Sequence, residues 1–323
     1  MLNSTIEYGK TPYDDVFRTL IVDHKDLLLA LLNEMFPDLK HKYTGDEKVI
    51  PLNDHYQQNR QDGEQDKRIT DSAVMVVDHS MEKRIFHLEC QSSDDGSLVI
   101  RMFEYDMQIA LKAAGEYTKG KLRVKVPNSG ILFLRCTKDT PDEFMVELVL
   151  PNGLEVSYDV PALKMKMYDI DTIFEKKLFF LIPFYMFNLE QYFKRIEDGN
   201  DVAIYEFKRQ LRDLRLRLEE SLNNGDIDVY LYRSIIDLSN KVNTALTDGK
   251  KHVLEMTEAI MRGPILDYEA KSILNKGISQ GISKGISKQE KKDIEKLTKY
   301  FMSQNPSMTV ESAKAAAESI LRN

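Results

Sequence analysis

The sequence has no long hydrophobic run. A membrane-spanning helix needs about 18 to 20 consecutive apolar residues, whereas the strongest candidate, Leu178 to Phe187, is ten residues long and contains Pro183. The first residues, Met1 to Lys10, show no basic stretch followed by an apolar one, which a secretory signal would have. We therefore expect a cytoplasmic protein with no membrane partner, in which Leu178 to Phe187 forms a buried helix.

Cysteine is also scarce, because the chain has only two, Cys90 and Cys136. Each lies in an apolar, strand-like run, with no CxxC pair and no histidine at the spacing of a metal site. Neither a disulfide framework nor a zinc site is indicated. We expect both cysteines to be packing residues.

An excess of positive charge is the third feature that is missing. The chain has 45 lysines and arginines against 52 acidic residues, a net charge of −7. A protein that coats nucleic acid non-specifically neutralises phosphates with lysine and arginine, so this class is disfavoured. A nuclease remains compatible with the composition, because a bound divalent cation brings positive charge and only a local basic rim is then needed.

The 323 residues are 42% hydrophobic, which is enough for a large core in one or two domains. Asn152-Gly153 is a strong hairpin signal between two strand-like runs. The order of the expected elements indicates an α/β or α+β fold with a mixed sheet flanked by helices. Periodicity and breaks predict a helix or helix pair over 13–35, an exposed loop over 45–67, strands over 71–77 and 85–91 joined as a hairpin, a helix over 98–114, and strands over 131–136, 144–150 and 154–160.

Everything from Asp171 onward is predicted to be helical. The second of these helices carries several basic residues, but acidic residues lie among them, so an ion-paired surface is favoured over a nucleic-acid contact. The resulting division is 1–195 for the catalytic domain, 196–265 for a helical region, and 266–323 for a linker and a terminal helical pair. The expected helices cover 171–193, 202–222, 228–246 and 250–261.

Residues 277–288 repeat Gly-Ile-Ser with a period of four. Three glycines weaken a helix by about 1 kcal/mol each relative to alanine. The segment is therefore interpreted as a flexible tether, with a helical linker stabilised by a partner chain as the alternative. In the second case the C-terminal helical region would form a homo-oligomer.

The residues with the clearest chemical potential lie in the predicted hairpin. Side chains alternate along a strand, so Glu89 and Gln91 point to one face while Leu88 and Cys90 point to an apolar layer. Pairing across a turn near residue 80 would bring Asp71 close to Glu89. Two carboxylates at one end of a sheet suit Mg²⁺, which prefers oxygen ligands and could activate water for phosphodiester hydrolysis.

This arrangement resembles the PD-(D/E)XK nuclease superfamily, and more narrowly the Rpn family of recombination-promoting nucleases, also called putative transposases. The resemblance covers about residues 11–195. Thr70 stands where proline is common in the superfamily, and Gln91 stands where lysine is usual, a replacement that the Rpn family shares. The matching segments are the Asp of the first strand and Glu-x-Gln of the second, Asp14-Asp15-Val16-Phe17-Arg18, Arg101 with Tyr105, Leu-Ile-Pro-Phe-Tyr within 178–187, and the Gly-Ile repeats.

The resemblance implies a restriction-endonuclease-like core with Asp71, Glu89 and Gln91 as catalytic residues. It also implies that Asp71 and Glu89 bind Mg²⁺, which Mn²⁺ could replace in vitro, and that the substrate is DNA, cleaved during recombination. Asp14 and Arg101 are possible additional site residues. Gln91 carries no charge, so it would stabilise the transition state less than lysine does.

Each of these residues has a structural alternative. Asp71 could cap a strand, Gln91 could simply end one, and Asp14 could cap a helix. Arg101 could pair with a neighbour on its helix instead of binding phosphate. His87 shares the face of Glu89 but, as a lone histidine, is expected to hydrogen-bond a neighbour, and Tyr105 is expected in the core.

The alternative function is a catalytically inactive DNA-binding or assembly module with the same fold, which the missing lysine and the acidic charge permit. An integrase-type transposase would need three carboxylates, and we find no convincing triad. Nuclease activity is therefore the leading hypothesis from the sequence.

Overall fold

The computed structural model describes most of the chain up to residue 261, and these residues belong to one compact unit, residues 1–263. Asp71, the repeat at 277–288 and the predicted terminal helices lie outside the described residues. The described ranges are 11–39, 42–52, 55–59, 65–69, 72–92, 96–113, 117–118 and 120–261.

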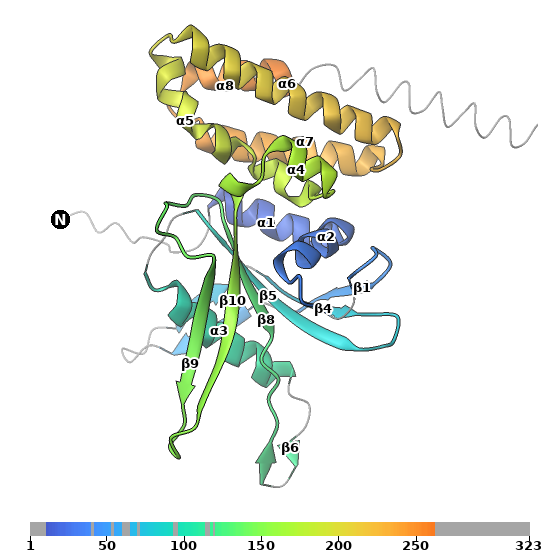
Figure 1. Ribbon diagram of the computed structural model, residues 1–323, viewed down its shortest axis with the longest axis vertical. Helices are drawn as coiled ribbons and strands as arrows, with labels where there is room; N and C mark the ends of the chain where they lie inside the picture. Colours follow the sequence, from blue (N-terminus) through green and yellow to red (C-terminus); the bar gives the residue numbers. More distant parts are fainter. Residues whose placement is uncertain are drawn as a thin grey trace, which may run out of the picture. The chain divides into compact units, whose positions relative to one another are not determined.

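The core of this unit is a six-stranded mixed sheet (Figure 1). Strand β5 lies in its interior, paired antiparallel with β4 and parallel with β8, and β8 is in turn parallel with β10. The outer strands β1 and β9 pair antiparallel with their neighbours. In spatial order the strands are β1 (Lys48–Pro51), β4 (Ser72–Val77), β5 (Lys83–Gln91), β8 (Asn128–Phe133), β10 (Glu155–Lys164) and β9 (Glu143–Val149).

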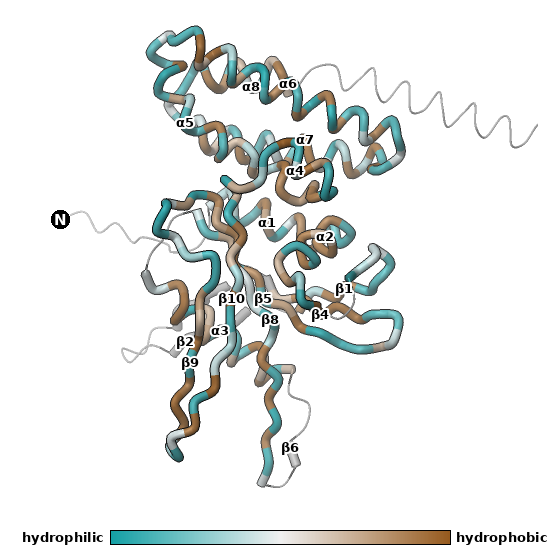
Figure 2. Tube along the Cα trace, in the orientation of Figure 1, coloured by the Kyte–Doolittle hydropathy of each residue, from teal (hydrophilic) through white to brown (hydrophobic). Residues whose placement is uncertain are grey.

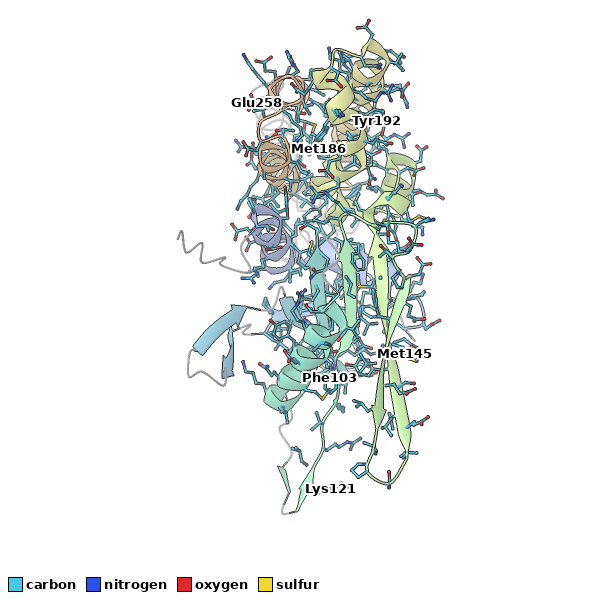
Figure 3. The ribbon with its side chains drawn as sticks, turned by 90° about the vertical axis from the view of Figure 1, so that its left-hand side faces the viewer. Phe103, Lys121, Met145, Met186, Tyr192 and Glu258 are labelled. Atoms are coloured by element: carbon cyan, nitrogen blue, oxygen red, sulfur yellow. The ribbon has the colours of Figure 1, made fainter. Side chains whose placement is uncertain are left out.

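Helix α3 (Leu98–Ala113) packs on one face of this sheet. Leu98 and Met102 join a core cluster with Ile131 and Phe133 of β8, and Phe103 packs against it. Figure 3 shows the helix, with Phe103 labelled, lying alongside the strands. The first half of α3 therefore presents apolar side chains to the sheet, as the predicted helix over 98–114 requires.

Helices α1 (Pro12–Asp23) and α2 (Lys25–Met35) cover the opposite face. They are separated at His24, so the predicted helix over 13–35 is two helices. Phe36, which directly follows α2, stacks against Phe86 of β5 with ring centroids 5.3 Å apart. Phe86 therefore points away from α3, and its neighbours in sequence point toward α3.

One glycine allows this close packing. A Cβ atom added to Gly130 of β8 would lie 2.2 Å from Sδ of Met35 and 3.2 Å from Cζ of Phe36. Real Cβ atoms do not approach other atoms so closely, so a larger residue at 130 would force the Met35 side chain to shift. Glycine at this position lets Met35 pack directly against β8.

The helices after the sheet pack on the α1 side of the unit. Helix α7 contacts α1 and the 3₁₀ helix η2, and Lys241 of α7 pairs with Asp15 of α1 at 2.5 Å. Packing is thus continuous across residue 195, where the sequence suggested a domain boundary. The elements are the 3₁₀ helix η1 (Met165–Met167), α4 (Ile170–Glu175), η2 (Phe179–Phe184), α5 (Met186–Glu197), α6 (Asp201–Asn223), α7 (Val229–Leu246) and α8 (Lys251–Met261).

The predicted continuous helix over 171–193 is wrong. Lys177 adopts a φ of 53°, in the left-handed region, and separates α4 from η2. Pro183 has no N–H with which to continue an α-helix, and it lies inside η2. Residues 178–187 are buried as expected, but they form a 3₁₀ turn and the start of α5.

The predicted loop over 45–67 is also wrong. It contains β1 and a separate two-stranded hairpin of β2 (His55–Asn59) and β3 (Gln65–Ile69). This polar segment has little of the apolar alternation that identifies a half-buried strand, so its backbone pairing was not apparent. A second small hairpin consists of β6 (Tyr117–Thr118) and β7 (Lys121–Leu122).

Hydropathy follows this layering. In Figure 2, α6 and α8 alternate between hydrophobic and hydrophilic residues along their length, as in helices covered on one side. Cys90 is buried on β5 and Cys136 packs against the α3 cluster, which confirms both as packing residues. None of the described helices has the length and apolar character needed to cross a bilayer.

Candidate active site

The predicted hairpin is confirmed as the β4–β5 pair. Its register matches Val77 with Lys83 at the turn and Ser72 with Leu88 at the far end. Glu89 therefore comes one residue after Leu88, the last residue of β5 that is paired with a described residue of β4. Asp71, which precedes Ser72 in the sequence, lies outside the described residues, so its distance from Glu89 stays a prediction.

Glu89 is a nearly fully buried carboxylate, only 4% exposed. Its Oε1 lies 3.3 Å from Nε2 of His87, and its Oε2 accepts a hydrogen bond of 3.1 Å from Nε2 of Gln91. These three side chains lie on one face of β5, as the alternation in the sequence predicts. A carboxylate buried at this depth needs such partners, because desolvation without them costs several kcal/mol.

His87 connects Glu89 to a second buried carboxylate. Its Nδ1 lies 2.7 Å from Oδ1 of Asp106 on α3, and neither side chain is exposed. Ser129 of β8 donates to Oδ1 of Asp106 at 2.5 Å, and the hydroxyl of Tyr158 of β10 donates to Oδ2 at 2.8 Å. A chain of hydrogen bonds thus runs from the core to Glu89.

Two opposing effects act on the pKa of His87. Burial lowers it, but the hydrogen bonds to Asp106 and Glu89 and the charges of both carboxylates raise it, to about 9. The protonated ring can donate from both nitrogens at once, which the neutral ring cannot. Between the two carboxylates, the doubly protonated form is favoured at neutral pH.

Gln91 links Glu89 to Arg101. The Gln91 amide donates to Glu89, and its Oε1 accepts a hydrogen bond of 3.3 Å from Nη2 of Arg101 on α3. Arg101 also donates to Oγ of Ser97 at 3.4 Å. The guanidinium of Arg101 is therefore beside the candidate site, whereas Tyr105 is buried in the core as expected.

Asp14 of α1 is brought near Glu89. Its pKa is raised, first by burial, while hydrogen bonds with Thr11 and the charge of Arg18 lower it and the charge of Glu89 raises it. Asp14 also forms a capping box with Thr11, whose N–H donates to Oδ2 at 2.9 Å. The capping role is confirmed, and the same side chain repels Glu89.

A further cation, Arg135, follows β8 at the same end of the sheet. The backbone N–H of Leu134 donates to the carbonyl of Gln91 at 2.8 Å, which places the end of β8 beside the end of β5. Arg135 pairs with Glu190 through two bonds of 2.7 Å and donates to the carbonyl of Ser92 at 3.2 Å. Its side chain is 43% exposed, but its charge is balanced by Glu190.

The residues present partly fit a divalent cation. Glu89 and Asp14 supply carboxylate oxygens, the ligand type that Mg²⁺ prefers, and their mutual repulsion would be relieved by a positive ion. Within the described ranges, however, no group of three His, Cys, Asp or Glu side chains is arranged to hold a metal ion. The predicted third acidic residue, Asp71, is not in those ranges.

Sequence reasoning missed the contribution of His87, Asp106, Ser129 and Tyr158. His87 was expected to hydrogen-bond a neighbour, which is confirmed, but its partners are Asp106 and Glu89. The one available signal was the alternation that put His87 and Glu89 on the same face. Asp106 was not predicted because an acidic residue within a helix is usually solvated, and nothing local indicated its burial.

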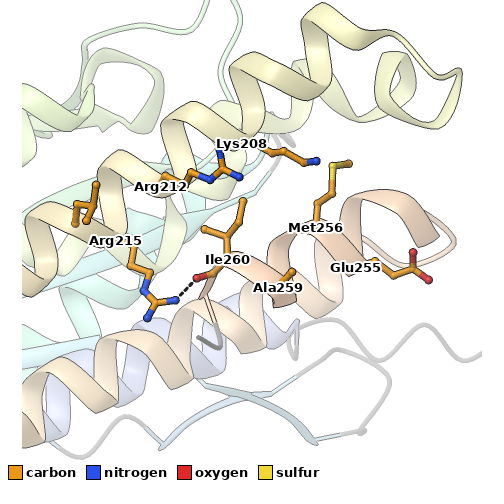
Figure 4. Close-up of a pocket in the computed structure, with 8 residues that line it drawn as sticks. Lys208, Arg212, Arg215, Glu255, Met256, Ala259 and Ile260 are labelled. Atoms are coloured by element: carbon orange, nitrogen blue, oxygen red, sulfur yellow. Dashed lines mark hydrogen bonds between the residues drawn. The ribbon is translucent and has the colours of Figure 1, made fainter. Parts of the chain in front are cut away.

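The basic residues of α6 belong to the helical part of the unit, and Figure 4 shows some of them facing α8. Lys208, Arg212 and Arg215 line an open hollow of about 570 Å³ between α6 and α8. Arg215 pairs with Glu219 at 2.8 Å and also donates to the carbonyl of Ile260. Arg209 and Arg217 of this helix are also ion-paired, which supports the predicted solvated, salt-bridged surface.

Comparison of the chain with protein-family models, with curated proteins and with solved structures finds no match.

Proposed function

We propose that this chain is a Mg²⁺-dependent DNA endonuclease with a PD-(D/E)XK, restriction-endonuclease-like core, and that it promotes recombination. The active centre consists of Asp71, Glu89 and Gln91. The observation that carries this proposal is the position of Glu89, a buried carboxylate near the end of an interior strand, with Gln91 bonded to it and Asp14 nearby. Buried carboxylates gathered at one end of a sheet, with polar partners aimed at them, are typical of functional sites.

The register of the hairpin supports the inclusion of Asp71. Ser72 is paired with Leu88, so an antiparallel pairing extended by one residue would set Asp71 opposite Glu89. Residues directly opposite each other in such a pair project to the same face. We infer that Asp71 supplies the second carboxylate for the ion.

The reaction is hydrolysis of a phosphodiester, in which water attacks phosphorus, one P–O ester bond breaks and the leaving oxygen gains a proton. A bound Mg²⁺ would polarise the phosphate and lower the pKa of the water. Asp71 and Glu89 would hold the ion. Their own contribution is to fix its place relative to the phosphate.

Gln91 and Arg101 would act on the substrate side. The Gln91 amide is held between Glu89 and Arg101 and can orient a water or a phosphate oxygen by hydrogen bonding. The guanidinium of Arg101 can bind a phosphate through two N–H groups. It would supply positive charge at the site, which an acidic protein needs locally in order to bind DNA.

The test is nicking of supercoiled plasmid in Mg²⁺. We expect the wild type to nick and both Asp71→Ala and Glu89→Ala to lose at least about a hundredfold in rate, as for removal of an essential charged group. Glu82→Ala is the matched control, because Glu82 lies in the turn of the same hairpin with its side chain 56% exposed. Circular dichroism verifies that each variant folds.

Absence of nicking by the folded wild type in Mg²⁺ and in Mn²⁺ would refute the proposal. Binding of DNA without nicking would then favour the inactive binding module. We also propose a cytoplasmic location and self-association through the C-terminal helical region, both from the sequence. Neither affects this test.

A further inference from the structure

Asp106 is buried with an unusual number of donors around it. It has no exposed surface, and it accepts hydrogen bonds from Ser129 and Tyr158 and contacts Nδ1 of His87. These partners come from β8, β10 and β5, so the carboxylate of α3 is tied to three neighbouring strands. A carboxylate fixed in this way is a rigid anchor.

His87 transmits this anchoring to Glu89. Its ring is fully buried and packs edge-on against Tyr105, with centroids 6.0 Å apart and planes at 86°. With Nδ1 on Asp106, the ring can turn only by breaking that contact. Nε2 is therefore held at Oε1 of Glu89, at 3.3 Å.

Within the described part of the chain, the contacts of Glu89 leave acceptor capacity for a further ligand. Each carboxylate oxygen has two lone pairs. Oε1 meets Nε2 of His87 and Oε2 meets Nε2 of Gln91, so each oxygen keeps one lone pair besides these contacts. His87 therefore orients Glu89 without occupying all of its acceptor sites.

We infer that His87 and Asp106 are positioning residues, anchored by Ser129 and Tyr158, that fix the Glu89 carboxylate in the orientation in which it binds the cation. This inference rests on the proposed function. Carboxylates that bind metal ions are themselves commonly hydrogen-bonded by outer groups, which fix their orientation. Here the carboxylate, not the histidine, would be the ligand.

The competing explanation is that the network only stabilises the fold. Two variants that carry a side-chain amide at position 87 distinguish this explanation from positioning of Glu89. The amide of His87→Asn can reach Asp106 in place of Nδ1 but not Glu89. The longer His87→Gln can present an N–H to Glu89 in place of Nε2. If His87 positions Glu89, His87→Gln should retain more Mn²⁺ affinity than His87→Asn. If His87 only holds Asp106, His87→Asn should retain more.

The experiment measures Mn²⁺ affinity by calorimetry, well below the melting temperature, alongside nicking kinetics. For His87→Asn we expect Mn²⁺ binding about 10- to 100-fold weaker, with kcat reduced and KM for DNA unchanged. His87→Gln should stay within about tenfold of wild type. Tyr158→Phe removes one anchor of Asp106 while keeping the ring, and should weaken Mn²⁺ binding in the same direction by a smaller factor. It is the milder variant if changes at His87 prevent folding.

Exposed residues of the same types provide the controls. His79→Ala, in the exposed turn of the hairpin, and Tyr205→Phe, whose side chain is 66% exposed, should bind Mn²⁺ like the wild type. Equal Mn²⁺ affinity for wild type, His87→Asn and Tyr158→Phe would overturn the inference. So would a smaller loss for Asn than for Gln.

Crystal structures of metal-free wild type, His87→Asn and His87→Gln distinguish failure of this inference from failure of the proposed function. If the wild type neither binds Mn²⁺ nor nicks DNA, the nuclease proposal fails. The orientation of Glu89 in the crystal structures then still tests whether His87 positions it. The Glu89 carboxylate should rotate in His87→Asn and remain in place in His87→Gln. An unchanged Glu89 in both variants contradicts positioning.

Discussion

The carboxylates of Asp14, at the start of α1, and Glu89, near the end of β5, repel each other although the two residues are far apart in the chain. The charge of Glu89 is one of the effects that raise the pKa of Asp14, after burial. This relationship joins the first helix to the hairpin independently of Asp71. It can be measured without metal or DNA.

Glu89→Gln should therefore lower the pKa of Asp14, because the amide removes a negative charge and leaves the burial of Asp14 in place. Carbon-13 NMR of the Asp14 carboxyl group, titrated in both proteins, gives the two values. Glu82→Gln, in the exposed turn, serves as the control and should leave Asp14 unchanged. An equal Asp14 pKa in wild type and Glu89→Gln would mean that the two acids are not neighbours.

Stability should fall as pH rises from about 6.5 to 9. Burial lowers the pKa of His87, but Asp106 of α3 and Glu89 of its own strand raise it from 6.5 to about 9. On its other oxygen, Asp106 accepts a hydrogen bond from the neutral Tyr158 of β10. A pKa raised by folding stabilises the native state fully below the unfolded value, and this contribution is lost as pH passes the folded value. The loss amounts to at most roughly 3 kcal/mol.

Urea denaturation of wild type and His87→Gln between pH 6 and 9.5 measures this effect. The variant, which cannot be protonated, should show a flatter dependence. His24 has its pKa lowered by burial, so its contribution is lost only as pH falls through 6.5, and this loss is common to the two proteins. Parallel curves for the two proteins would show that His87 is not protonated between its two carboxylates.

Arg101→Ala should weaken DNA binding and make it less dependent on salt. If the guanidinium contacts a phosphate, the slope of log K against log salt should become shallower by about 1. Fluorescence anisotropy with labelled duplex at several salt concentrations measures the slope. Arg123→Ala is the control, because this exposed arginine precedes β8 and lies toward the opposite end of that strand. The same slope for wild type and Arg101→Ala would leave Arg101 with a purely intramolecular role.

Gly130→Ala should destabilise the fold by about 1 to 3 kcal/mol through overpacking. The new methyl group would lie 2.2 Å from Sδ of Met35, which is 2% exposed and has little room to move. Urea denaturation of the single variants and of Gly130→Ala with Met35→Ala gives the coupling between the two sites. We expect Gly130→Ala to lower the free energy of unfolding much less in the Met35→Ala protein than in the wild type. An equal loss in the two proteins would contradict this contact.

Local sequence signals were sufficient for most elements. The β4–β5 hairpin, α3, and the strands on either side of Gly153 follow from alternation, helical spacing and a turn that requires a positive φ, here 79° at Gly153. The face shared by His87, Glu89 and Gln91 follows from the same alternation. These features depend on neighbours within one element or one tight turn.

Other features depended on partners distant in the chain, which only the tertiary structure supplies. The burial of Asp106 under Tyr158 and the approach of Asp14 to Glu89 are of this kind. A sequence pattern shows which way a side chain points within its element. The packing of elements decides what it meets there, because burial and charge act through space and not along the chain.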